Sequence, residues 1–126
     1  MSLLGSSTVM AFSATTDAER AKVFYRDQLG LKLISEEQYA LVFDAGGTML
    51  RVQRVKEIPG AKYTSLGWQV PDIEAKVDEL AAAGVKMERY GIPGQDEKGI
   101  WTPPGSSTKV AWFKDPDGNI LSLTQF

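Results

Sequence analysis

Few side chains in this sequence can perform chemistry. The 126 residues include neither histidine nor cysteine. Without them the chain lacks the commonest general base, the usual soft-metal nitrogen ligand, thiolate nucleophiles and disulfides. Any reaction therefore has to use carboxylates, Tyr, Lys, Arg, Ser or an added cofactor.

The carboxylates provide one weak candidate for acid–base catalysis. Glu36 and Glu37 are neighbours at the end of an expected strand and point to opposite sides, so they do not form a catalytic pair. Asp96 and Glu97 lie in a segment with the composition of a solvated loop. Glu88 is the remaining candidate, and its sequence context fits a salt bridge equally well.

Composition limits the classes of function. With 43% apolar residues, a net charge of −2 and an isoelectric point near 5.1, residues 1–126 are expected to form one domain without a surface for nucleic acid or anionic membranes. No apolar run approaches the ~20 residues of a membrane helix. The first residues lack the basic region and apolar core of a signal peptide, so the expected location is the cytoplasm.

Hydrophobic periodicity predicts the same order of elements twice: a strand, a helix, then three strands. In the first module, about residues 8–55, strands are expected over 9–14, 31–36, 39–45 and 48–55, with a helix that begins at a capping box of Thr16 and Glu19 and ends at Gly30. In the second module, about residues 63–126, strands are expected over 65–70, 85–90, 109–114 and 120–125, with a helix from Asp72 to Gly84. Residues 56–62 form the expected linker between the modules.

Three segments carry a resemblance to a known family. ERAKVFYRDQLGLKL, VPDIEAKVDELAAAGV and AWFKDPDGNILSL resemble the vicinal oxygen chelate superfamily, which includes glyoxalase I, extradiol dioxygenases, fosfomycin resistance enzymes and bleomycin resistance proteins. The resemblance extends from about residue 9 to residue 126. It implies an α+β fold in which two βαβββ modules form a curved mixed-sheet cup, with helices outside and a ligand cavity within. It also implies a homodimer, and leaves open whether modules pair within one chain or across two.

The resemblance also identifies where metal ligands would stand. In metalloenzymes of this superfamily the ligands come from the first and last strands of each module and are typically His, His or Gln, and Glu. The corresponding residues here are Met10, Arg51, Ser65 and Ser122. Hard cations need several carboxylate or carbonyl oxygens, and a guanidinium repels a dication. We therefore expect neither a metal site nor a cofactor.

Alternation along the strands predicts which side chains face the cavity of the cup. They combine apolar, aromatic and a few polar groups, which is typical of a small-molecule site. The expected ligand-binding residues are Met10, Phe12, Met49, Arg51, Gln53, Ser65, Gln69, Trp101, Trp112 and Ser122.

Three of these residues have alternative roles. Arg51 provides a planar fork for a carboxylate or phosphate, unless it forms an internal ion pair with a carboxylate such as Glu88 or reaches the rim. Trp101 either closes over a bound ring or anchors its long loop to the sheet. Alternation alone does not decide whether Trp112 or Phe113 faces the cavity.

These features predict a metal-independent protein that binds a small, partly aromatic, anionic molecule. Sequestration of a drug or toxin, as in bleomycin resistance proteins, is one version. The alternative is a glyoxalase-like lyase or isomerase, or a dioxygenase, that uses a displaced metal site. A metabolite sensor is a third possibility. The sequence identifies neither the ligand nor any catalysed reaction.

Overall fold

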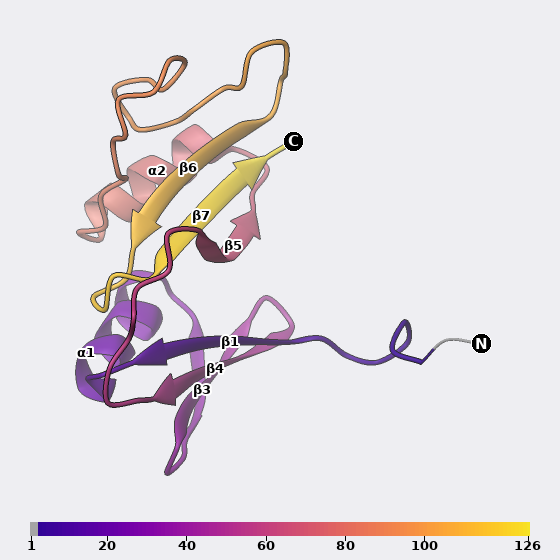
Figure 1. The fold of residues 1–126 in the computed structure, drawn as a ribbon, viewed down its shortest axis with the longest axis vertical. Helices are drawn as coiled ribbons and strands as arrows, with labels where there is room; N and C mark the ends of the chain where they lie inside the picture. The colour runs from indigo at the N-terminus through magenta and orange to yellow at the C-terminus, as the bar shows by residue number, and fades with distance from the viewer. Residues whose placement is uncertain (1–2) are drawn as a thin grey trace.

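The computed structural model describes residues 3–126 and contains two mixed sheets. The elements, in chain order, are β1 (Met10–Thr15), α1 (Ala18–Lys22), η1 (Val23–Gln28), β2 (Lys32–Glu36), β3 (Ala40–Ala45), β4 (Thr48–Arg54), β5 (Thr64–Gln69), α2 (Ile73–Ala82), β6 (Lys109–Lys114) and β7 (Ile120–Gln125). The first sheet has the strand order β1-β4-β3-β2, and the second sheet has the order β5-β7-β6 (Figure 1). This α+β arrangement confirms the predicted fold class.

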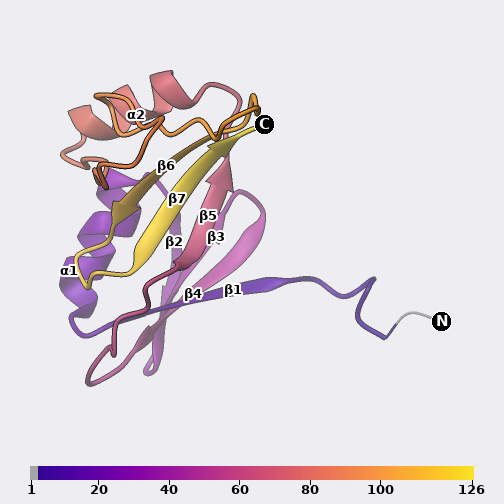
Figure 2. The ribbon, with the colours of Figure 1, turned by 45° about the horizontal axis from the view of Figure 1, so that its top comes forward.

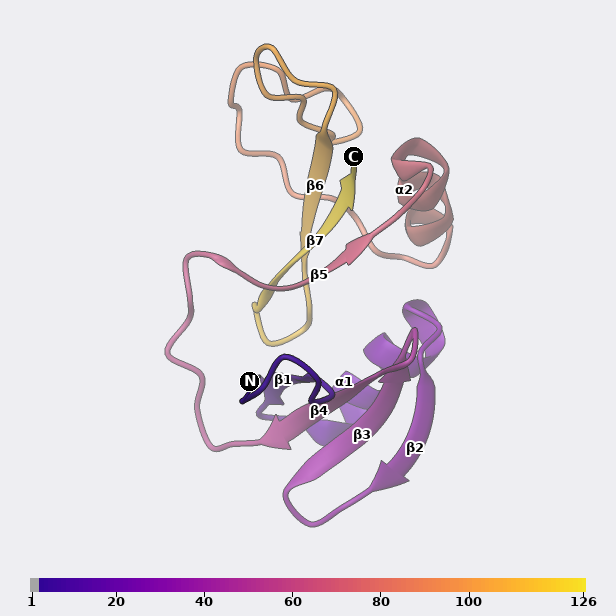
Figure 3. The same cartoon turned by 90° about the vertical axis from the view of Figure 1, so that its right-hand side faces the viewer.

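The two halves of the chain share one pairing rule. In each half the first strand runs parallel to the last, β1 beside β4 and β5 beside β7. The segment that joins β4 to β5 crosses between the sheets on the side of the molecule opposite α2 (Figure 3). The segment that precedes β1 extends away from the body of the molecule (Figure 2).

The strand expected over residues 85–90 is wrong. Within the described residues this segment has no strand, and a side chain bonds part of its backbone. The amide of Gln95 donates to the carbonyl oxygens of Glu88 and Gly99, at 3.0 Å each, and its oxygen accepts from the Tyr90 amide at 2.8 Å. The Gln95 side chain therefore satisfies the Glu88 carbonyl and the Tyr90 amide, while the Glu88 amide donates to the Trp112 carbonyl of β6 at 2.7 Å.

The first helix begins one residue later than the capping box predicts. The Asp17 side chain, rather than Thr16, caps the helix by accepting from the Arg20 amide at 3.1 Å. Thr16 is bonded to the distant Asp117 instead. The helix then widens into η1, where the Leu29 amide donates to the carbonyl five residues earlier, at Phe24. The second helix begins where expected, with Asp72 as its cap.

One hydrophobic core extends across both halves. Leu50 and Val52 of β4 are fully buried beneath α1 and η1, and Leu80 of α2 packs over the second sheet. The rings of Phe24 and Phe113 lie 6.5 Å apart and connect the two sides. Within residues 3–126, no helix is both long and apolar enough to cross a membrane.

Candidate ligand-binding site

The open face of the first sheet carries five of the predicted site residues. Strand register pairs Met10 with Met49 and Phe12 with Arg51, and places Gln53 on the same face. Leu50 and Val52 alternate with them and face the helices, as expected for period-two side chains. The structure therefore brings these five residues together on one surface, which is largely apolar and accessible.

Arg51 forms an ion pair, although its partner is not the one suggested by the sequence. Its Nη2 donates to Oε1 of Glu37 at 2.7 Å, and the Arg51 side chain is 25% exposed. Glu88 lies instead beside Lys114 in the second half, at 3.6 Å. The expectation of a pair with Glu88 is therefore wrong, because Glu88 belongs to the other half. Glu37 locally balances the guanidinium charge.

The open face of the second sheet carries Trp112 and Ser122. These residues are paired in register, and Gly67 pairs with Ser122 on its other side. A Cβ at Gly67 would lie 2.6 Å from the Ser122 hydroxyl, so any other residue here would have to displace that hydroxyl. Phe113 points to the helix side, where it is buried in the core. The structure thus resolves the choice between the two aromatic residues in favour of Trp112.

A pocket of about 410 Å³ lies on this second open face, and we call it the open-face pocket. It is lined by Ala61, Lys62, Tyr63, Thr64, Tyr90, Trp112, Lys114, Gly118 and Ile120. Trp112 is the predicted site residue that lines it. The sequence did not identify Lys62, which lies in the expected linker over residues 56–62, or Tyr63, which precedes the strand expected over 65–70. Lys114 was detectable, since it follows Trp112 by two residues and alternation puts both on one face.

Aromatic side chains form the wall of the open-face pocket. The Tyr90 ring packs edge-on against Trp112, with the ring centres 5.6 Å apart. Trp101 packs on the same indole at 5.8 Å. The Trp101 indole donates to the carbonyl of Pro93 at 3.0 Å, and its backbone exchanges two hydrogen bonds with Val110. These bonds favour the role of Trp101 as the anchor of its loop.

The pocket carries two ammonium groups. Lys114 lies near Glu88, and both side chains are partly exposed. Lys62 has no hydrogen bond or ion pair within residues 3–126. Glu88 is a single carboxylate paired to a lysine, and its environment gives it no feature of a general base beyond proximity to the pocket.

The remaining predicted residues lie elsewhere. Ser65 falls at a bulge in β5, and its hydroxyl donates to the Ile120 carbonyl at 3.3 Å. Gln69 lines a different hollow of about 370 Å³, on the helix side of the second sheet. The ten predicted residues therefore divide among several surfaces, with one group of five on the first sheet and a smaller group of Trp101, Trp112 and Ser122 on the second.

The four positions that correspond to metal ligands do not fit a divalent ion. Met10 supplies a thioether, Arg51 is a cation paired to Glu37, and the Ser122 hydroxyl is buried against Gly67. Across residues 3–126, no group of three or more His, Cys, Asp or Glu side chains gathers as a metal site requires. The donor chemistry therefore provides no route for a metal-dependent step at these positions.

The turn over residues 115–119 connects the second sheet to the first half of the chain. Asp115 is buried, and its carboxylate accepts from the Tyr25 hydroxyl at 2.6 Å and from the Asn119 side chain at 2.8 Å. The Asn119 amide also donates to the Ala14 carbonyl of β1 at 2.9 Å. Burial, reinforced by Asp115, raises the pKa of the Tyr25 phenol well above its ordinary value, so this hydroxyl remains a donor.

Asp117 forms the second connection of this turn. Its carboxylate accepts from the Thr15 hydroxyl at 2.6 Å, from the Thr16 amide and hydroxyl at 2.9 and 2.7 Å, and from Arg20 at 3.1 Å. Burial alone would raise the pKa of this carboxyl, but the hydrogen bonds from both threonines and the Arg20 charge outweigh it and lower the pKa. The turn thereby fixes Gly118 and Ile120, which line the open-face pocket.

Comparisons with known proteins agree with this geometry. The model of the Glyoxalase/Bleomycin resistance protein/Dioxygenase superfamily matches residues 9–123. The sequence is 31% identical over 123 residues to the uncharacterized protein YraH of Bacillus subtilis (strain 168), covering 85% of this chain and 88% of YraH. It is 25% identical over 123 residues to a probable lactoylglutathione lyase of Vibrio parahaemolyticus serotype O3:K6, covering 86% and 83% of the two chains. The structure of a glyoxalase family protein from Enterococcus faecalis superposes with a TM-score of 0.71 at 20% identity, covering 98% of this chain and 99% of that one.

Proposed function

Because this chain belongs to the glyoxalase/bleomycin resistance protein/dioxygenase superfamily, we propose that it binds a small aromatic anion in the open-face pocket without a metal ion. The observation that carries the proposal is the composition of that pocket. Three rings, from Tyr63, Tyr90 and Trp112, share it with the ammonium groups of Lys62 and Lys114.

The pocket offers both of the interactions that an aromatic anion needs. A planar ligand ring can stack on Trp112 or meet the edge of Tyr90, contacts worth about 0.5–1.5 kcal/mol beyond the area they bury. The two lysines supply charge-assisted hydrogen bonds to carboxylate or phosphate oxygens. Its volume of about 410 Å³ lies within the range of small-molecule sites.

Binding alone is the function that these residues support best, with sequestration of a drug or toxin as one form of it. The rival is a lyase or isomerase, favoured by the similarity to the Vibrio protein that is named a lactoylglutathione lyase. That chemistry would need a cluster of carboxylate or imidazole groups, and the pocket has the single carboxylate of Glu88 nearby, paired with Lys114.

The test is a calorimetric titration of the full chain with phthalate, an aromatic dicarboxylate. We expect saturable binding that weakens about tenfold in Lys114→Gln, since one charged hydrogen bond is lost. Lys86→Gln, an exposed lysine outside the pocket, is the matched control and should bind as the wild type does. Absence of saturation at about 1 mM, or an equal loss in the control, would refute the proposal.

The exposed apolar surface of the first sheet supports a second proposal, that the chain forms a homodimer through this face. Met10, Phe12 and Met49 remain 44%, 49% and 42% exposed although they lie side by side. Dimers are common in this superfamily, and a contiguous apolar patch is typical of an interface. Sedimentation should show a dimer that Phe12→Asp converts to monomer, whereas Tyr39→Asp at the β2–β3 turn should leave it intact. A wild-type monomer at micromolar concentration would contradict this.

A further inference from the structure

A crevice separate from the open-face pocket lies between the two halves, on the helix side of the sheets, and we call it the inter-module crevice. Its volume is about 370 Å³. It is lined by Leu29, Leu31 and Gly46 from the first half and by Trp68, Gln69, Val70, Pro71, Lys76, Leu80, Phe113 and Leu123 from the second. It shares no lining residue with the open-face pocket, so it is a distinct site.

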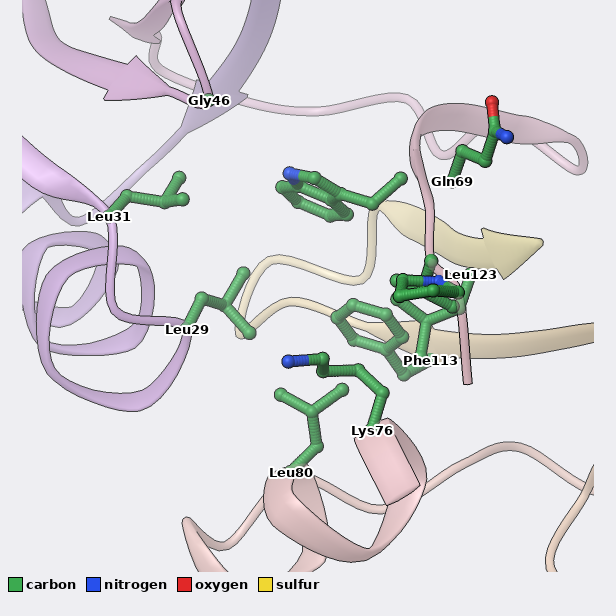
Figure 4. A pocket seen from close by; sticks show the side chains of 11 residues that line it. Leu29, Leu31, Gly46, Gln69, Lys76, Leu80, Phe113 and Leu123 are labelled. Atoms are coloured by element: carbon green, nitrogen blue, oxygen red, sulfur yellow. The ribbon is translucent and has the colours of Figure 1, made fainter. Parts of the chain in front are cut away.

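The walls of the inter-module crevice are apolar. Leu29 and Leu31 approach from the first half, and Leu80 faces them from α2 (Figure 4). The rings of Trp68 and Phe113 stack with their centres 6.3 Å apart and form a flat aromatic surface. Such walls favour an alkyl chain or a ring and provide few hydrogen-bond partners for a polar molecule.

Lys76 is the single charged residue among those that line the crevice. Its side chain extends from α2 toward the space between Leu29 and Phe113 (Figure 4). The ammonium group donates to Glu79 at 2.9 Å, an exposed pair one turn apart on the helix. Such surface pairs are weak, and an ammonium has three donors, so Lys76 can also bind an anion at the mouth of the crevice.

We propose that the inter-module crevice binds a medium-chain aliphatic monocarboxylate. The carboxylate pairs with Lys76, and the alkyl chain lies among Leu29, Leu31 and Leu80. A dry cavity of about 150 Å³ accommodates benzene, so a crevice more than twice that size holds a chain of about ten heavy atoms. The single ammonium group of the crevice matches one carboxylate, whereas the open-face pocket has two ammonium groups. Because both halves contribute walls, the bound chain also stabilises their packing.

The experiment uses decanoate and the uncharged 1-decanol as probes, titrated into the full chain and followed by backbone amide chemical shifts. We expect saturable shifts at residues around Leu29, Trp68 and Leu80. Lys76→Gln should weaken decanoate about tenfold and leave decanol within twofold, because only the charged contact is lost. Lys86→Gln should change neither affinity.

A second variant tests the volume of the crevice. Leu31→Trp places a larger ring against the crevice, and we expect it to weaken both probes by at least fivefold. The proposal is overturned by shifts at Tyr63, Tyr90 and Trp112 instead, by displacement of decanoate with phthalate, or by the absence of saturation at about 1 mM. It does not depend on the proposed function, since binding in either site can fail while the other holds.

Discussion

The two halves of the molecule begin and end alike, but only the first completes a regular sheet. In the first half, β3 and β2 continue the ladder outward from β4. In the second half, the corresponding segment over residues 85–90 forms no strand, and its backbone is bonded by the Gln95 side chain and, at the Glu88 amide, by the Trp112 carbonyl of β6. The same predicted order of elements therefore produced a four-stranded sheet in the first half and a three-stranded sheet with an irregular segment in the second.

The irregular half carries the open-face pocket. Its loop holds Tyr90 and Trp101 against Trp112, which creates an aromatic wall beside two lysines. The open face of the regular half is largely apolar, and its Arg51 is already paired with Glu37. The open-face pocket therefore lies on the sheet that has three strands rather than four.

A substitution that breaks the connection between the two halves should cause the largest loss of stability. Replacing Asp115→Ala removes a buried acceptor and leaves the Tyr25 hydroxyl and the amides of Asp117 and Asn119 without their partner. We expect a loss of about 3–5 kcal/mol in the free energy of unfolding, measured in urea. Asp78→Ala, an exposed carboxylate on α2, should cost under about 1 kcal/mol. A similar cost for both would mean that the turn does not join the halves.

Gln95→Ala tests whether the side chain replaces a strand. The variant loses three hydrogen bonds to backbone groups, and we expect a cost of about 2–3 kcal/mol. Hydrogen exchange should accelerate over residues 85–101 and remain unchanged in β2 and β3. Gln53→Ala, on the first open face, is the control and should cost under about 0.5 kcal/mol. Faster exchange throughout both halves would contradict a local role for Gln95.

Asp117→Asn tests the second connection between the halves, because the effect of this substitution on stability should depend on pH. Because the folded state lowers the pKa of Asp117, its contribution is complete above the unfolded pKa of about 3.9 and is lost as pH falls through the lower folded pKa. At neutral pH the variant should be about 1–3 kcal/mol less stable than the wild type. That difference should shrink below a pH of about 4. A constant difference across this range would show that charge on Asp117 contributes nothing.

The smallest effect is expected at Arg51. Because Glu37 already pairs with its guanidinium, Arg51→Gln should change phthalate affinity by less than about twofold, against about tenfold for Lys114→Gln. Calorimetry on both variants provides the comparison. A loss of phthalate affinity in Arg51→Gln as large as that in Lys114→Gln would indicate that the ligand binds on the first open face.

Local patterns accounted for most of the fold. Alternation along β4 and β7 correctly separated core leucines from open-face residues, because successive side chains of a strand point to opposite sides whatever surrounds them. The cap at Asp72 was predictable for the same reason, since it depends on residues within one turn. The candidate site was less predictable, and among the residues of the open-face pocket only Trp112 belonged to the predicted set.

What the sequence determined by itself is therefore local or compositional: the alternating faces, the order of elements apart from the strand expected over residues 85–90, and the absence of histidine and cysteine. Tertiary structure decided the partners. The Thr16 side chain bonds Asp117 rather than capping the first helix, Arg51 pairs with Glu37, and a residue of the expected linker, Lys62, lines the open-face pocket. In each case the partner is a group distant in the sequence. Its proximity in space decides the contact, and spacing along the sequence does not encode that proximity.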